Sequence, residues 1–192
     1  MDYKKILNNK REPLEGPLII EPKVFKDKRG FFLESWNRKK MENILKKDIN
    51  FVQDNHSFSQ KGVLRGMHYQ VPPFQQSKLI RCLSGEIYDV VVDLRKNSKT
   101  FGTWAGIILN DKNLKEFWIP AGFAHGFITL SNSANVIYKT DAYWDKKSEN
   151  ALIWNDKTIN IKWPETICEI IISDKDREAK TLNELKNLNL LL

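Results

Sequence analysis

The sequence predicts a mostly β protein, a sandwich or barrel that carries only a few short helices. Its runs of β-branched and aromatic residues are short, and Gly, Pro, Asn or Asp separates many of them, as is typical of strands joined by turns. Helical spacing of apolar residues is clear only in residues 39–47 and, more weakly, in the tail 181–192. The expected strands are 18–20, 24–25, 31–33, 78–83, 87–94, 103–109, 117–119, 126–130, 135–139 and 151–154.

The chain shows no repeat and no low-complexity linker, so residues 1–192 are expected to form one domain. Ser84 and Gly85 are typical turn residues, which predicts a hairpin between the strands on either side of them. A sheet protein has edges to protect, and six Trp with ten Phe are more aromatic bulk than one small barrel holds. A homodimer is therefore expected.

The composition, 41% hydrophobic and 29% charged, is ordinary for a globular protein. No run approaches the roughly 20 apolar residues that cross a bilayer, and no apolar run follows the first residues, so a cytoplasmic protein without a membrane partner is expected. The net charge of +7 suggests an anionic partner. Because the basic residues are scattered, a small anionic substrate is favoured over nucleic acid.

Cys82 and Cys168 are too few for a disulfide framework and lack metal-binding spacing, so both are expected to be buried thiols. The chain has three histidines, His56, His68 and His125, and any imidazole chemistry must use one of them. We expect His56, which follows a cluster of amides and a carboxylate, to orient a side chain that contacts the substrate.

The spacing Pro-x-Gly-x-x-His at residues 120–125 resembles the second motif of the cupin superfamily of small β-barrels. The segment around His68 resembles a degraded first cupin motif, with Gln70 where a second metal-binding histidine would stand. Two imidazoles without a paired carboxylate make a poor transition-metal site. The sequence therefore predicts no metal and no other cofactor.

A closer resemblance runs through nearly the whole chain, in motifs such as QDNHS at 53–57, VLRGMHYQ at 63–70 and WIPAGFAHGF at 118–127. Further matching segments are 21–25, 29–35, 78–81, 89–95, 100–102, 138–140, 153–156 and 173–176. In order and spacing these blocks resemble the dTDP-4-dehydrorhamnose 3,5-epimerases. The resemblance implies a cupin-like jelly-roll β-barrel with a few short helices. It also implies a cofactor-independent epimerase that inverts C3 and C5 of a dTDP-linked 4-keto-6-deoxyhexose.

The resemblance also implies a role for each matching residue. The protons at C3 and C5 are acidic because a ketone lies between them, so epimerisation needs a base, a stabilised enolate and an acid. His68 matches the base and Asp176 the carboxylate that orients it. Lys78 and Arg65 match cations near the ketone, and Tyr138 matches the proton donor.

Other matching residues are implied to bind the nucleotide, with cations placed to offset the diphosphate. They are Arg29, Glu34, Gln53, Asn55, His125, Tyr143, Trp144, Glu149 and Lys175. Family barrels lend N-terminal residues to the neighbouring subunit's pocket. Two departures from the family pattern are Trp144, where a second tyrosine is usual, and Ser77 in place of a glycine before the lysine. An indole can stack on thymine as a phenol ring does.

Taken singly, these residues also have ordinary structural explanations. Lys78 could face solvent, Asp176 could cap a helix, Tyr138 could line the barrel wall, and Tyr143 with Trp144 could lie in the core. Three other functions also remain open: a single-centre epimerase, a non-catalytic sugar-nucleotide-binding cupin, and a metal-dependent dioxygenase.

Overall fold

The computed structural model describes residues 1–165 and 169–192, and over these residues the protein is built from two facing β-sheets and a projecting hairpin. The six-stranded sheet has the order β1 (Asp2–Leu7), β2 (Pro13–Glu21), β10 (Glu116–Ile119), β7 (Lys78–Ser84), β12 (Ser133–Thr140) and β5 (Gln53–Gln60). The five-stranded sheet has the order β13 (Glu149–Ala151), β6 (Leu64–Gln70), β11 (Phe123–Thr129), β8 (Glu86–Asp93) and β9 (Trp104–Asn110). The prediction of a mostly β sandwich or barrel is confirmed.

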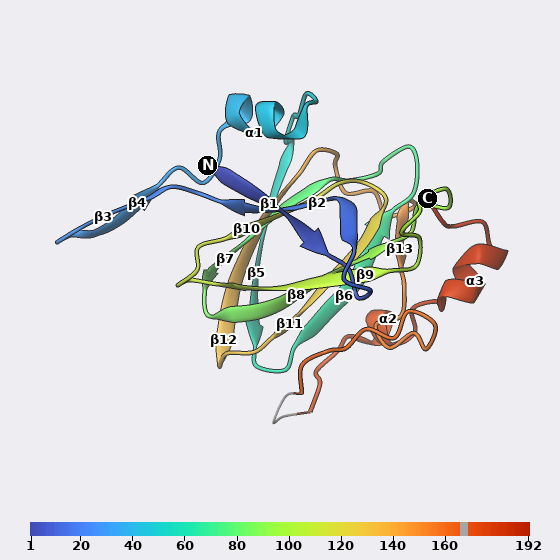
Figure 1. The fold of residues 1–192 in the computed structure, drawn as a ribbon. Helices are drawn as coiled ribbons and strands as arrows, with labels where there is room; N and C mark the ends of the chain where they lie inside the picture. The colour runs from blue at the N-terminus through green and yellow to red at the C-terminus, as the bar shows by residue number, and fades with distance from the viewer. Residues whose placement is uncertain (166–168) are drawn as a thin grey trace.

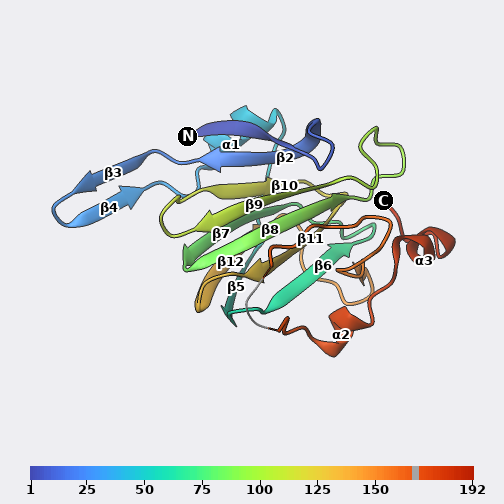
Figure 2. The same cartoon turned by 60° about the horizontal axis from the view of Figure 1, so that its bottom comes forward.

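The inner faces of the two sheets enclose the main hydrophobic core (Figure 2). Ile80 and Val136 come from the six-stranded sheet, while Val91 and Phe127 come from the five-stranded sheet. Alternate residues of β8 point to the opposite face, where Val90 and others are covered by the C-terminal segment. Six of the eight residues in the run 87–94 are aliphatic or aromatic, because both faces of its strand are covered.

Three short helices complete the chain, and they are α1 (Arg38–Leu45), α2 (Asp174–Arg177) and α3 (Leu182–Asn187). Helix α1 covers the outer face of the six-stranded sheet with Met41, packed near Trp118. Thr181 caps α3, which ends well before the predicted end of the helical tail because Asn189 adopts a positive φ of 54°. None of the helices in residues 1–165 and 169–192 is long and apolar enough to cross a membrane.

The strands β3 (Val24–Asp27) and β4 (Gly30–Leu33) form a two-stranded hairpin that projects away from the barrel (Figure 1). Phe25, Phe31 and Phe32 on this hairpin are all more than half exposed. Burying large aromatic rings is strongly favourable in water. The hairpin therefore presents an apolar surface that residues of its own barrel do not cover.

The predicted hairpin at Ser84–Gly85 is wrong, because β7 and β8 belong to different sheets. Gly85, with a φ of 78°, turns the chain from one sheet to the other, and a Cβ there would lie 2.0 Å from the carbonyl oxygen of Ser133. The backbone N–H of Gly85 donates to Asp111, which fixes the corner. Cys82 beside it is buried as expected, whereas Cys168 lies outside the described residues.

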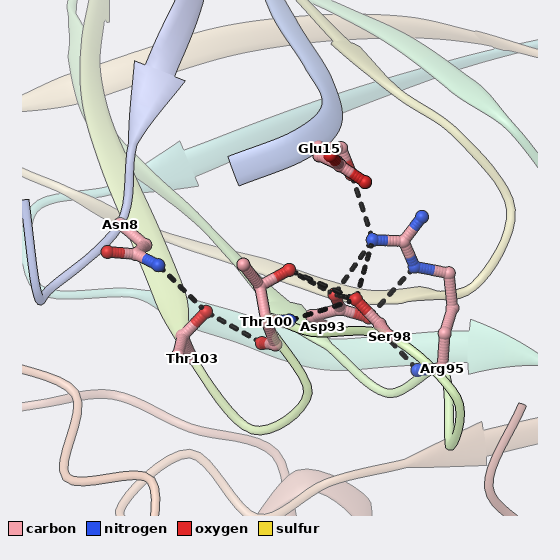
Figure 3. A network of polar contacts seen from close by, with 7 residues as sticks. All are labelled: Asn8, Glu15, Asp93, Arg95, Ser98, Thr100 and Thr103. Atoms are coloured by element: carbon pink, nitrogen blue, oxygen red, sulfur yellow. Dashed lines mark hydrogen bonds and ion pairs between the residues drawn. The ribbon is translucent and has the colours of Figure 1, made fainter. Parts of the chain in front are cut away.

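A polar network fastens the loop after β8 to the N-terminal strands (Figure 3). Asp93 is fully buried and accepts hydrogen bonds from the side chains of Arg95, Ser98 and Thr100 at 2.6–2.9 Å. Arg95 also donates to the carbonyl of Glu15 at 2.9 Å. Every carboxylate oxygen of Asp93 is thereby paired, which is what a buried charge requires. The division of the chain into one domain, 1–192, stays a prediction.

Candidate active site

A cavity of about 250 Å³ opens between the two sheets, and the polar side chains predicted from the sequence gather there. Its lining consists of Ser57, Arg65, His68, Lys78, His125, Phe127, Tyr138, Ser173, Lys175 and Asp176. All four residues predicted to be catalytic belong to this set, and so do three of those predicted to bind substrate. The site lies where apolar walls meet a few convergent polar groups, as ligand pockets commonly do.

A bulge in β6 brings Arg65 and His68 to the same side of the sheet. His68 lies opposite His125 of β11, but Arg65 lies opposite Phe127, so three residues of β6 match two of β11. Gly66, with a φ of 131°, allows this, because a Cβ there would lie 2.5 Å from the Cα of Gly126. The two strands touch at these glycines, and the two imidazoles stand next to each other on the inner face.

Asp176 reaches His68 from α2, more than one hundred residues along the chain. One carboxylate oxygen lies 2.7 Å from Nε2 of His68, and the other accepts the backbone N–H of Gly66 at 3.2 Å. Burial alone would raise the pKa of Asp176, but the hydrogen bonds from His68, Gly66 and Ser173 outweigh it and lower the pKa. Asp176 is therefore an anion. It does not cap α2, because the N-cap residue is Ser173, whose hydroxyl accepts the backbone N–H of Asp176.

A second His–Asp pair lies beside the first. His125 places Nε2 at 2.9 and 3.1 Å from the two oxygens of Asp89 on β8. Both side chains are buried, with 9% of His125 and 0% of Asp89 exposed. Burial lowers the pKa of His125, although the negative charge of Asp89 opposes the shift.

The six-stranded sheet contributes Lys78 from β7 and Tyr138 from β12 to the opposite wall. Lys78 is buried rather than solvent-facing, and this burial lowers its pKa to about 8, while the charges of Asp89 and Glu149 act in the other direction. Burial also raises the pKa of Tyr138 above its ordinary value, so the phenol stays protonated at neutral pH. The pocket thus has a cation and an acid facing two imidazoles.

Four of the remaining residues predicted to bind substrate belong to two bonded groups. Glu149 on β13 is ion-paired with Lys175 at the edge of the cavity. Gln53 donates to the side chain of Asn55 at 2.9 Å and accepts the backbone N–H of Trp144 at 3.0 Å, so these three are joined.

Tyr143 and Trp144 are 65% and 54% exposed rather than buried in the core. Gln70, the residue at the missing metal-ligand position, is buried and holds their loop. Its amide donates to the carbonyl of Tyr143 at 3.1 Å and accepts the backbone N–H of Asp145 at 2.7 Å.

Three residues lie away from the cavity of their own chain. Arg29, at the tip of the projecting hairpin, pairs with Asp27, and 84% of its side chain is exposed. Glu34 pairs with Lys40 at 2.6 Å. His56 faces the outer side of the six-stranded sheet and bonds Asn135 at 3.0 Å, so the expectation that it orients a residue of the site is wrong. Strand alternation explains this, because His56 lies between the inward Asn55 and Ser57.

No group of three His, Cys, Asp or Glu side chains gathers closely enough to hold a metal ion in the part of the chain that the structure describes. The two imidazoles each bind a separate carboxylate through Nε2. The absence of a metal remains a prediction that elemental analysis of the purified protein can test.

Comparison with known proteins accounts for this arrangement. The family model described as dTDP-4-dehydrorhamnose 3,5-epimerase matches residues 11–184. The chain belongs to the dTDP-4-dehydrorhamnose 3,5-epimerase family. An Escherichia coli K12 member is 48% identical over 185 residues, which cover 96% of this chain and 100% of that protein. A Shigella flexneri member is 54% identical over 159 residues, 83% of this chain and 87% of that one.

Solved structures of epimerases match the whole fold. The enzyme from Legionella pneumophila, in complex with dTDP-4-keto-L-rhamnose, has a TM-score of 0.90 and 45% identity, and the match covers 99% of this chain and 97% of that one. A 3'-monoepimerase from Streptomyces bikiniensis, in complex with dTDP-quinovose, has a TM-score of 0.87 and 31% identity over 93% and 91% of the chains. The predictions of the family, the cupin-like jelly-roll barrel and the isomerase class are confirmed.

Sequence reasoning missed four residues of this epimerase site and its surroundings. Ser57, Phe127 and Ser173 line the cavity, and Asp89 lies behind it. Asp89 carried a signal, because it is a carboxylate inside the apolar run 87–94, where an unpaired charge would be costly. The other three have no distinctive residue type and are recognised only from the fold.

Proposed function

We propose that the protein converts dTDP-4-dehydro-6-deoxy-D-glucose to dTDP-4-dehydro-L-rhamnose by inverting C3 and C5. The observation that carries this proposal is a base and an acid on opposite walls of one cavity. His68 stands on β6 of one sheet and Tyr138 on β12 of the other. A sugar ring held between the sheets can lose a proton to one face and gain a proton on the other, which is what inversion requires.

His68 is the base. Its Nε2 is committed to the carboxylate of Asp176 at 2.7 Å, so Nδ1 is left with the lone pair that takes the sugar proton. The negative charge of Asp176 stabilises the imidazolium that forms and fixes the ring orientation. With 32% of its side chain exposed, His68 can carry a charge and can exchange its proton with water between the two inversions.

Lys78 and Arg65 stabilise the enolate. Removing a proton beside the ketone moves negative charge onto the ketone oxygen, and a fixed cation in a site screened from water lowers the energy of that charge. Lys78 is buried on the wall opposite His68, and its ammonium form is required. Arg65 is held by its bond to Ser59 at 3.0 Å.

Tyr138 is the proton donor. Its raised pKa keeps the phenol protonated until an enolate forms beside it. The transfer moves the phenolic proton to the sugar carbon and leaves a phenolate, which is reprotonated from water before the next turnover. Arg65 lies near enough for its charge to stabilise that phenolate, since it opposes the rise in the pKa of Tyr138.

Incubation of the substrate with the protein in heavy water tests the proposal. Deuterium at both C3 and C5, read by NMR, is the expected result. Label at only one carbon would instead support a single-centre epimerase, the second candidate, which the resemblance to a 3'-monoepimerase favours. A His68→Asn variant that exchanged the sugar protons at the parent rate would refute the proposed base and support a non-catalytic binding role.

We further propose that Glu149, Lys175, Gln53, Asn55, Tyr143 and Trp144 bind the nucleotide and its diphosphate, while His125 binds the sugar. Lys175 lies at the cavity edge, and the exposed indole of Trp144 can stack on thymine. Binding of dTDP alone, measured by calorimetry, should weaken in Trp144→Ala. Arg65, by contrast, faces the sugar, so Arg65→Ala should change dTDP binding less than it changes turnover.

Cytoplasmic location stays a prediction.

The active form is proposed to be a homodimer in which each hairpin β3–β4 enters the partner's site. The hairpin exposes three phenylalanines and Arg29, and neither Arg29 nor Glu34 reaches the cavity of its own chain. Mixing inactive Arg29→Ala with inactive His68→Asn tests this. If the site is shared, random exchange restores one good site in half of the dimers, about one quarter of parent activity. No recovery after verified subunit exchange would contradict sharing.

A further inference from the structure

Asp89 is a fully buried carboxylate on the inner face of β8, inside a run of aliphatic residues. It does not line the cavity, and none of the roles assigned above uses it. Placing a carboxylate here is unfavourable unless partners satisfy it. Its hydrogen-bond partner is His125, a residue of the site, so the cost of burying Asp89 is linked to the state of the site.

His125 depends on Asp89 for its tautomer. Nε2 of His125 lies within 3.1 Å of both oxygens of Asp89, on the neighbouring strand. Because burial keeps His125 neutral, its ring carries a single proton. A carboxylate can only accept, so that proton sits on Nε2, and Nδ1 is left as a hydrogen-bond acceptor. An acceptor suits a sugar hydroxyl and does not compete with Lys78 for the ketone oxygen.

Lys78 lies on the inner face of β7 and Asp89 on β8 of the facing sheet, and both are buried. Burial favours the neutral amine, and the charges of Asp89 on β8 and Glu149 on β13 oppose it. The other titratable groups around the cavity are His68 and Arg65 on β6, His125 on β11, Tyr138 on β12, and Lys175 and Asp176 on α2. Glu149 is already paired with Lys175 at the cavity edge. Asp89 is therefore the buried anion available to balance Lys78.

We propose that Asp89 is a positioning residue. It fixes His125 as the Nε2–H tautomer, and it holds Lys78 in the ammonium form that stabilises the enolate. The second half of this statement rests on the proposed role of Lys78, whereas the first half concerns the free protein and is independent of any reaction.

Two substitutions separate the two effects. Asp89→Asn keeps an acceptor oxygen of the same shape but removes the charge, so His125 should keep its tautomer while Lys78 loses its counter-charge. The alkaline limb of the kcat pH profile should then move to lower pH by about one unit, with kcat reduced about tenfold and KM little changed. Asp89→Leu removes both the acceptor and the charge, so the two tautomers of His125 should become mixed as well.

The tautomer is read by long-range ¹H–¹⁵N NMR of the imidazole rings, which is tractable because the chain has three histidines. The charge of Lys78 is also read without turnover, from the pH dependence of its acetylation followed by peptide mass spectrometry. Asp93→Asn is the matched control, since Asp93 is equally buried on the same strand but pairs with Arg95, Ser98 and Thr100 (Figure 3). Asp93→Asn should lower the stability of the fold and leave the pH dependence of Lys78 acetylation unchanged.

An Nδ1–H or mixed tautomer of His125 in the parent protein overturns the first half of the proposal. Superimposable Lys78 titrations in the parent and Asp89→Asn overturn the second. If Asp89→Leu does not fold, Asp89→Asn and the parent spectrum still decide both halves. Should the sugar protons fail to exchange in the parent, the proposed function fails, while the tautomer and acetylation measurements remain informative about Asp89.

Discussion

The two His–Asp pairs of the site have the same hydrogen-bond pattern but different surroundings. His68 and His125 lie directly opposite each other on β6 and β11, and each binds a carboxylate through Nε2. His68 is 32% exposed, and His125 is 9% exposed. Exposure lets an imidazole become charged, and burial keeps it neutral. The same pair of residue types therefore provides a base in one position and a fixed neutral ligand in the other.

Replacing each histidine in turn tests this difference most strongly. His68→Asn should lower kcat/KM by roughly 10³-fold or more, because the other imidazole on that wall, His125, is buried and its lowered pKa makes it a weaker base. His125→Asn should cost only about tenfold, because an amide still offers an acceptor to the substrate. Steady-state kinetics of the two variants gives the comparison. Equal losses would mean that the two imidazoles share the role of base.

Replacing Asp176, the carboxylate of the more exposed His–Asp pair, should give the next largest effect. Asp176→Asn should lower kcat by roughly 10- to 100-fold, because a neutral amide does not stabilise the imidazolium as the carboxylate does. KM should change little, since Asp176 contacts His68 and Gly66 rather than the nucleotide. A loss confined to KM would place Asp176 in substrate binding instead.

The buried Lys78 should set the alkaline limit of activity. Burial lowers the pKa of Lys78 to about 8, so the ammonium form predominates below that pH and is lost above it. Activity that needs the cation should therefore fall as the pH rises through about 8. In Lys78→Arg, with a side chain that stays charged, the fall near this pH should disappear even if kcat is lower. A limb that persists unchanged in this variant would belong to another group.

The smallest effect concerns stability in acid. Burial lowers the pKa of His125 in the folded protein, while the unfolded chain keeps an ordinary value of about 6.5. As the pH falls through that value the unfolded state binds a proton that the folded state does not, so stability falls. His125→Gln should reduce the drop in Tm between pH 7 and pH 5 by a few degrees, measured by calorimetry. A drop as large as that of the parent would show that other groups cause it.

The sequence predicts the chemistry of the cavity better than its boundaries. His68, Lys78, Tyr138 and Asp176 come from three strands and a helix, and the family pattern brings them together without any knowledge of the packing. Arg29 could not be placed in the same way, because the local sequence pattern does not determine the direction in which a hairpin projects from its barrel.

Topology and burial also limit what the sequence can predict about the fold and the site. Ser84–Gly85 has the residues of a hairpin turn, but a turn within one sheet and a corner between two sheets use the same local conformation. Asp89 is visible in the sequence as a carboxylate in a largely apolar strand. Its hydrogen-bond partner, His125, comes from β11, and strand order cannot be predicted from a single strand. The role of Asp89 therefore depends on residues of other strands.

The contact between Gly66 and Gly126 limits how this enzyme can be redesigned. Because the two main chains touch there, the separation of the two strands that carry the imidazoles is set by backbone contact. Any methyl group added at either position would collide with the opposite strand. Engineering the protein to accept a bulkier sugar must therefore begin on the six-stranded sheet, with small cavity-lining residues such as Ser57. The contact between β6 and β11 at the two glycines must stay unchanged.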